Sequence, residues 1–144
     1  MNKIYSFLLV LIFAFAGNVN AQNSPVGLWK TIDDKSNEAK SHLEIYEEDG
    51  KYFAVVAKLL RKPADTVCDN CKGDKKGKPL LGMVIVENMA SYKDYWKGGN
   101  IMDPESGKDY SCSMWFEDGK VDELKVRGKH WTGLYRTQTW HRVK

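Results

Sequence analysis

Two cysteines three positions apart are the residues whose type and spacing are best suited to chemistry. A Cys-x-x-Cys pair such as Cys68 and Cys71 can supply half of a zinc site, act as a redox pair or close a local disulfide. The only other cysteine is Cys112, and no second Cys-x-x-Cys completes a zinc site. A redox pair of the thioredoxin type opens a helix in a βαβ unit, which this sequence lacks. We therefore expect a Cys68–Cys71 disulfide in an oxidising compartment, with a metal site or a redox role as the alternatives.

The remaining reactive side chains form no catalytic or metal-binding pattern. The histidines His42, His130 and His141 are scattered without the spacing of metal ligands. The sequence has no Gly-x-Ser-x-Gly, no phosphate-binding glycine loop and no His-Glu-x-x-His. Cys112 falls on the apolar face of an alternating stretch, which indicates a buried, unreactive thiol. We predict no catalytic residue, no metal and no cofactor, and the sequence assigns no enzymatic reaction.

A second group of residues could orient a ligand without reacting with it. The last stretch alternates with period two and places Arg136, Gln138 and Trp140 on one face, which we assign to the interior of the fold. Burying a guanidinium and an amide costs several kcal/mol unless a carboxylate, water or a ligand satisfies them. The chain is also rich in aromatic residues, with five tryptophans and seven tyrosines. Adding Tyr110 and Trp96 gives five candidate ligand-binding side chains.

Short strands must position these candidates, because no stretch beyond residue 21 keeps a helical period over three turns. The expected strands include residues 25–32, 42–47, 52–60, 80–86, 110–116, 124–127 and 133–143. Tight turns are expected at Asp49-Gly50, at residues 103–107 and at Asp118-Gly119. Residues 61–79 form the longest loop. Residues 88–99 are expected to form a helical turn or a loop across one end of the fold.

About eight short strands without βαβ spacing predict an all-β fold: a single antiparallel up-and-down β-barrel, or a related sandwich. Pairing of the first strand with the last would close the barrel and remove its exposed edges. We expect one domain over residues 22–144, since a chain of this length buries a sufficient core without a metal.

Residues 1–21 have the pattern of a signal peptide. Lys3 precedes an apolar run over residues 4–16, and Val19 and Ala21 occupy the −3 and −1 positions of a cleavage site. We expect export to the periplasm or the extracellular space, with no transmembrane segment left after cleavage. Loss of Lys3 lowers the formal net charge from +3 to +2. That charge is too small and too mixed to indicate a nucleic-acid partner.

Several motifs together resemble one bacterial family. They are Gly27-x-Trp29-x-Thr31, the run from Trp96 to Tyr110 that contains Asp103-Pro104-x-x-Gly107, residues 124–128, and the closing residues 136–143. The chain is similar to the exported bacterial family catalogued as domain of unknown function 2147. The resemblance implies a lipocalin-like barrel and carries over no catalytic or cofactor residue. In lipocalin-like barrels an arginine of the last strand packs over the tryptophan of the first. We therefore expect Arg136 or Arg142 to cover Trp29 and close the barrel beside Gly27.

The function is expected to follow from whether the barrel is hollow. An eight-stranded barrel is either filled by its own side chains or holds one small ligand. Our first hypothesis is an exported module of the bacterial envelope that binds a small, partly apolar or amphiphilic molecule. The alternative is a filled-barrel envelope protein whose loops contact a protein or a glycan. A cavity would favour the first hypothesis, and an exposed aromatic patch at Tyr92, Tyr95 and Trp96 would favour the second.

Overall fold

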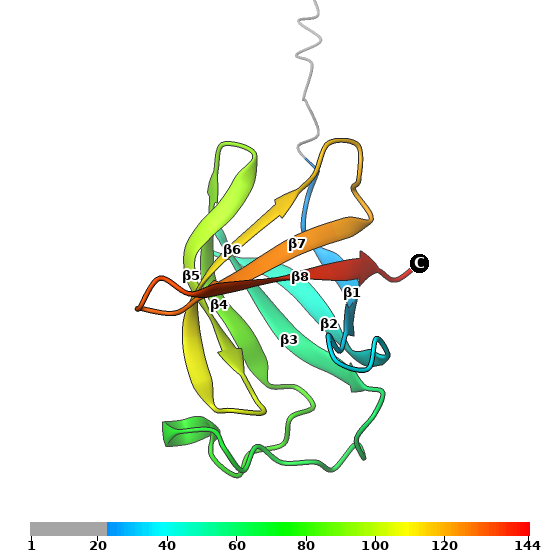
Figure 1. The fold of residues 1–144 in the computed structure, drawn as a ribbon, viewed down its shortest axis with the longest axis vertical. Coiled ribbons are helices and arrows are strands. Elements are labelled where there is room, and N and C mark those ends of the chain that lie inside the picture. Colours follow the sequence, from blue (N-terminus) through cyan, green and yellow to red (C-terminus); the bar gives the residue numbers. More distant parts are fainter. Residues whose placement is uncertain (1–22) are drawn as a thin grey trace, which may run out of the picture.

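Eight antiparallel strands, each paired with the next along the chain, close into one barrel (Figure 1). The structure is a computed structural model and describes residues 23–144. The strands are β1 (Gly27–Ile32), β2 (Ala39–Glu48), β3 (Lys51–Leu59), β4 (Val84–Tyr92), β5 (Tyr95–Asp103), β6 (Lys108–Phe116), β7 (Glu123–Lys129) and β8 (Tyr135–Arg142). This architecture confirms the predicted up-and-down barrel.

Alternation along the strands places the apolar residues inside. In β2, Leu43 and Ile45 are almost fully buried, whereas Glu44 between them is exposed. Such alternation is the pattern of a sheet with one face on the core and one in water. The largest fully buried side chains are Trp29, Trp96 and Trp140, which come from β1, β5 and β8. Rings from distant parts of the sequence therefore share one core.

Aromatic rings fill one end of the barrel. The rings of Trp29 and Trp96 both pack against Phe116, with centroids 6.0 Å and 5.8 Å away. Tyr52 lies edge-on to Trp96 at 6.0 Å. We call Trp29, Tyr52, Trp96 and Phe116 the aromatic plug. The short turns β2–β3, β4–β5 and β6–β7 lie at this closed end, so the β1–β2, β3–β4, β5–β6 and β7–β8 connections surround the opposite end.

The first and last strands meet over a short seam. Only Trp29 with Arg142 and Lys30 with His141 are paired between β1 and β8, and the backbone N–H of Val143 donates to the carbonyl oxygen of Leu28. All three contacts belong to the half of the barrel that holds the aromatic plug. The pairing confirms that the first and last strands close the barrel.

The region over residues 88–99 is a hairpin, not the helical turn or crossing loop expected from the sequence. It forms the adjoining ends of β4 and β5, with Lys93 and Asp94 as the turn. Two features hide the strand period: Asn88 has a left-handed backbone with φ of 58°, and the register shifts between Lys97 and Gly99. The β-propensity of the tyrosines and tryptophan in this region prevails over the irregular pattern.

The long loop between β3 and β4 runs across the bottom of Figure 1 and carries the single short helix η1 (Gly73–Lys75) of the described chain. Within residues 23–144 no helix is long and apolar enough to cross a membrane. The expected signal peptide over residues 1–21 lies outside the described residues.

Candidate ligand-binding cavity

A cavity of about 840 Å³ occupies the barrel at the end opposite the aromatic plug. Ligand pockets in proteins typically measure about 300–1,000 Å³, so this one is large enough for a small molecule. Its wall is largely apolar and draws on most of the strands. The apolar wall includes Leu43, Val56, Leu59, Leu80, Ile85, Ile101, Val126 and Trp140. The interior of the barrel is therefore filled at one end and hollow at the other.

Few polar groups lie inside the cavity, and some of them already have partners. The hydroxyls of Thr31 and Ser41 are 2.8 Å apart and hydrogen-bond each other. The indole N–H of Trp140 donates to the Gln138 side-chain oxygen at 3.4 Å. Across residues 23–144, neither the Gln138 side-chain nitrogen nor the Tyr110 hydroxyl has a hydrogen-bond partner. Both groups remain able to orient a ligand.

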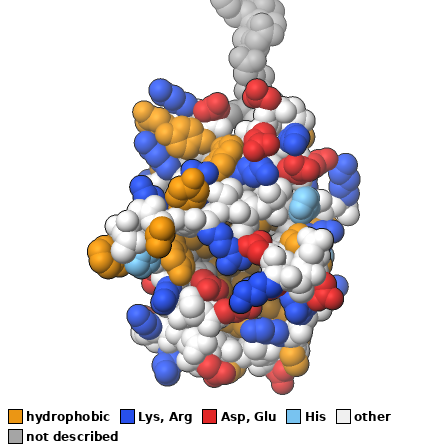
Figure 2. Space-filling view, in the orientation of Figure 1, with side chains coloured by type: hydrophobic (Ala, Val, Ile, Leu, Met, Phe, Trp, Pro, Cys, Tyr) orange, Lys and Arg blue, Asp and Glu red, His pale blue; other side chains and the backbone are white. Residues whose placement is uncertain are grey.

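Charged side chains of both signs ring the open end, which we call the mouth. Lys40 pairs with Glu105 at 2.9 Å, Arg61 with Asp33 at 3.4 Å, and Arg136 with Asp34. The space-filling view shows acidic and basic groups around a recess in its lower half, with apolar surface between them (Figure 2). Arg61 and Asp33 join two loops, whereas Lys40 of β2 and Arg136 of β8 each join a strand end to a loop at the mouth.

Asp33 organises the β1–β2 loop at the mouth. Its carboxylate accepts hydrogen bonds from the backbone N–H groups of Ser36 and Lys35, at 2.9 Å and 3.0 Å. These two backbone bonds, Ser36 first, hold the pKa of Asp33 below its usual value, and the Ser36 hydroxyl and Arg61 act in the same direction. Asp33 is therefore ionised at neutral pH and keeps Arg61 at the mouth.

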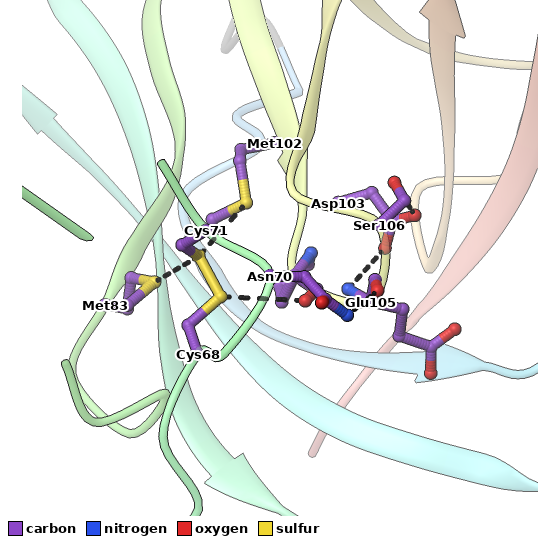
Figure 3. The surroundings of a disulfide bond; sticks show 9 residues. Cys68, Asn70, Cys71, Met83, Met102, Asp103, Glu105 and Ser106 are labelled. Atoms are coloured by element: carbon purple, nitrogen blue, oxygen red, sulfur yellow. Dashed lines mark hydrogen bonds between the residues drawn. A yellow bond between two sulfur atoms is a disulfide. The ribbon is translucent and has the colours of Figure 1, made fainter. Parts of the chain in front are cut away.

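The loop between β3 and β4 is fastened by a disulfide between Cys68 and Cys71, as the sequence predicts. The pair is buried, with Cys71 sulfur 4.0 Å from the Met83 sulfur and 3.8 Å from that of Met102 (Figure 3). A disulfide has no S–H to donate, so these are packing contacts of polarizable sulfur atoms, not hydrogen bonds. The disulfide thus anchors the loop to the barrel wall.

The same loop sits directly on the β5–β6 turn. The Asn70 side-chain nitrogen donates to the Glu105 carbonyl oxygen at 2.6 Å, a contact drawn in Figure 3. Gly107 closes this turn with φ of +66°, and a Cβ at this position would collide with the Asn70 carbonyl oxygen. Only glycine gives both the backbone conformation and the space. The disulfide loop and the β5–β6 turn therefore support each other at the mouth.

The family of the chain follows from its match over almost the whole described barrel. Residues 27–142 match the model of domain of unknown function 2147, described as an uncharacterized protein conserved in bacteria. The chain belongs to this family. Among solved structures it is similar to a Helicobacter pylori protein described as belonging to the lipocalin family, with a TM-score of 0.72, 18% sequence identity and 84% of each chain covered. At that identity the likeness shows the lipocalin-like fold alone. No curated protein matches the chain.

The five candidate ligand residues fall into three groups in this barrel. Gln138, Trp140 and Tyr110 line the cavity. Arg136 also lines it but lies at the mouth, where its side chain is 65% exposed and pairs with Asp34. We expected its guanidinium to be buried. However, β8 begins at Tyr135, so Arg136 lies at the rim, and water and a loop carboxylate solvate it.

Trp96 was wrongly grouped with these residues. It is the second residue of β5, which begins at the closed end, so its ring belongs to the aromatic plug and does not line the cavity. Its indole N–H is buried without a hydrogen-bond partner among the described residues. Its burial also means that Tyr92, Tyr95 and Trp96 form no exposed aromatic patch together.

The closure residues meet at the plugged end. The Arg142 guanidinium lies over the Trp29 ring at 4.3 Å from its centroid, and the Trp29 indole N–H donates to the Pro25 carbonyl oxygen at 2.7 Å. Gly27, with φ of +139°, leaves space for Arg142, whose Nη1 would lie 2.9 Å from a Cβ there. Of the two arginines considered, Arg142 covers the tryptophan and Arg136 does not.

Cys112 is free and buried, and burial raises the pKa of its thiol to about 12. Within residues 23–144 no three side chains of His, Cys, Asp or Glu are grouped so that they could hold a metal ion.

Sequence reasoning missed the residues of the mouth. Asp34, Lys35, Lys40, Lys62 and Glu105 lie in or beside connections, where no period distinguishes inside from outside. One signal could have found them: in an up-and-down barrel every second connection lies at the same end, so these loops must converge.

Proposed function

We propose that this protein is an exported small-molecule-binding barrel of the bacterial envelope, which holds a partly apolar ligand with its polar group toward the mouth. The observation that carries the proposal is the cavity of about 840 Å³, which is apolar in its wall and ringed by charges at its opening. Binding sites for small molecules combine such an apolar surface with a few placed polar groups.

The polar groups favour an anionic or hydrogen-bonding head group. Each of the mouth carboxylates of Asp33, Asp34 and Glu105 is engaged by a cation. Lys35 and Lys62 line the same mouth, and their ammonium groups have no ion-pair or hydrogen-bond partner within the described part of the chain. An anionic amphiphile such as a fatty acid would place its tail along the apolar wall and its carboxylate near these cations.

Export is supported by the sequence of residues 1–21 and by the Cys68–Cys71 disulfide. Disulfides persist in oxidising compartments such as the periplasm and the extracellular space. The lipocalin-family description of the similar Helicobacter pylori protein adds a fold that can hold a ligand in its interior.

The filled-barrel alternative has less support. It would need an interior closed by its own side chains, whereas only the plugged end of this barrel is closed. It would also need the aromatic patch of Tyr92, Tyr95 and Trp96, in which Trp96 is buried.

The test is a calorimetric titration of the protein with a medium-chain fatty acid, together with native mass spectrometry of protein purified from its exporting host. We expect saturable binding and a bound small molecule. Leu59→Trp, on the cavity wall of β3, should abolish binding by filling the cavity. Val55→Trp is the matched control, because Val55 lies on the same strand, pairs with the exposed Glu44 and does not line the cavity.

Gln138→Leu should weaken binding, because it removes an amide that orients the ligand. It also removes the acceptor of the buried Trp140 N–H, so the free energy of unfolding of this variant is measured beside its affinity. Native mass spectra without a ligand, combined with no saturable binding in the titration, would contradict the proposal. Equal binding by the wild type and Leu59→Trp would place any ligand outside the cavity.

A further inference from the structure

Three large apolar side chains project into water from the β7–β8 hairpin. Trp131 is 89% exposed, Leu134 76% and Tyr135 63%. By contrast, Trp29, Trp96 and Trp140 are each no more than 2% exposed. The space-filling view shows this apolar group at its left edge, where the hairpin projects in Figure 1. Contiguous exposed apolar groups on a folded protein commonly mark a contact surface.

The hairpin turn holds these side chains in a defined arrangement. The His130 N–H donates to the Leu134 carbonyl oxygen at 2.7 Å, and the Gly133 N–H donates to the His130 carbonyl oxygen at 2.9 Å. The His130 Nδ1 atom lies 2.8 Å from the Thr132 hydroxyl, and the His130 and Trp131 rings are 5.4 Å apart. The fold therefore presents Trp131 and Leu134 outward from a hydrogen-bonded turn.

The exposed tip is continuous with the cavity mouth. Leu134 and Tyr135 belong both to the exposed apolar group and to the cavity lining. His130, at the base of the turn, also lines the cavity, and its ring lies 6.2 Å from the ring of Tyr110. An apolar surface thus runs from the tip of the hairpin into the barrel.

Cations accompany this surface. The exposed Lys129 ends β7 beside the turn, and the Arg127 guanidinium lies over the Tyr135 ring at 4.2 Å. Lys35 and Lys62 lie at the mouth, and no carboxylate among the described residues pairs with either of them. Tryptophan, tyrosine and leucine flanked by lysine and arginine suit the boundary between head groups and acyl chains of an anionic bilayer.

We propose that the β7–β8 hairpin docks the cavity mouth on an anionic lipid bilayer. Trp131 and Leu134 enter the boundary region, while the cations face the phosphate groups. A second copy of the chain fits less well, because three side chains on one turn offer far less surface than the roughly 1,200–2,000 Å² buried by stable protein interfaces. Docking does not depend on the cavity, whereas its use for exchanging an amphiphile with the bilayer rests on the proposed function.

The test measures co-sedimentation of the full chain with vesicles of equimolar phosphatidylethanolamine and phosphatidylglycerol, and with vesicles of phosphatidylcholine alone. We expect binding to the anionic vesicles, weakened by salt, and a blue shift of tryptophan fluorescence. Trp131→Ser combined with Leu134→Ser should lower the partition coefficient at least about tenfold. Both positions are exposed, so the fold should be retained. Tyr92→Ser is the matched control, because Tyr92 is an exposed aromatic residue in the β4–β5 hairpin at the closed end.

Equal binding by the double variant and the wild type would overturn the proposal, as would no binding to anionic vesicles. A concentration-dependent dimer that the double variant abolishes, without vesicle binding, would assign the hairpin to a second copy and also overturn it. Fatty-acid binding in solution is measured separately with Leu59→Trp. If the protein docks on vesicles but binds no fatty acid, the bilayer proposal stands and only the proposed binding of a fatty acid in the cavity is refuted.

Discussion

Arg142 and Trp29 are paired across the seam of the barrel, and both side chains turn to the same face, where the guanidinium covers the indole at 4.3 Å. The same guanidinium donates to the carbonyl oxygens of Ser24, Val26 and Val121 at 3.1–3.3 Å. One side chain therefore connects the segment before β1, the β6–β7 turn and the last strand. The contact between Arg142 and Trp29 therefore stabilises the β1–β8 seam at the plugged end of the barrel.

Replacing Arg142 with methionine should lower the free energy of unfolding by about 2 kcal/mol or more, because the cation–π contact and four charge-assisted hydrogen bonds to three carbonyl oxygens are lost. Arg127→Met is the control, since Arg127 lies over Trp115 and Tyr135 on the outer surface. Urea denaturation followed by circular dichroism gives both values. If the two variants lose the same free energy of unfolding, Arg142 stabilises the fold no more than an arginine on the outer surface does.

The contact of Gly107 with the disulfide loop predicts a difference between two glycines. Gly107 and Gly119 both have positive φ, +66° and +73°, but a Cβ at Gly119 meets no atom within 4 Å. Gly119→Ala should cost about 1 kcal/mol through backbone strain alone. Gly107→Ala should cost at least about 2 kcal/mol more, since Asn70 must move. It should also speed proteolysis within residues 60–83. If Gly107→Ala and Gly119→Ala have the same free energy of unfolding, the loop over residues 60–83 accommodates the added Cβ without an energetic cost.

The disulfide predicts a simple count of thiols. With a thiol reagent and no reductant, the folded protein should show none, because Cys112 is buried, and the unfolded protein should show one. Replacing both Cys68 and Cys71 with serine should lower the free energy of unfolding by about 2 kcal/mol. Three reactive thiols after unfolding would mean that the pair is reduced.

Cys112 predicts how stability changes at alkaline pH. Its thiol has a usual pKa of 9.0, which burial raises to about 12 in the fold. Between about pH 9 and pH 12 the Cys112 thiol ionises in the unfolded chain but stays protonated in the folded chain. The contribution of Cys112 to the free energy of unfolding is therefore fully present below about pH 9. It falls as the pH rises above that, by up to about 1.4 kcal/mol per pH unit.

Denaturation of the wild type and of Cys112→Ala from about pH 8 to 10.5 isolates this contribution from that of other groups. The stability advantage of the wild type should shrink as the pH rises. An advantage that is independent of pH would mean that the thiol ionises equally in both states.

The sequence predicts the closed end far better than the mouth. Trp29 lies in a short strand whose period of two assigns its side chain to the inner face, so its burial follows. The arginine that covers it came from the resemblance to lipocalin-like barrels, which left Arg136 and Arg142 as alternatives. The hairpin over residues 88–99 was missed because Asn88 and the Gly98-Gly99 pair interrupt that period. The pairing of Arg136 with Asp34 joins a strand end to a loop, and no local rule connects residues so far apart in sequence.

The short β1–β8 seam determines how the barrel responds to force. A closed tube resists torsion strongly, whereas a tube slit along part of its length twists easily. Backbone pairing joins β1 to β8 only around Trp29 and Lys30, so from Thr31 to the mouth the cylinder is slit. Of the ion pairs and hydrogen bonds between described side chains, the contact of Arg136 with Asp34 spans the two sides there. The plugged half should therefore resist torsion and the mouth half should yield to it. A molecule of the proposed kind would then enter by widening the slit, without breaking any strand pairing.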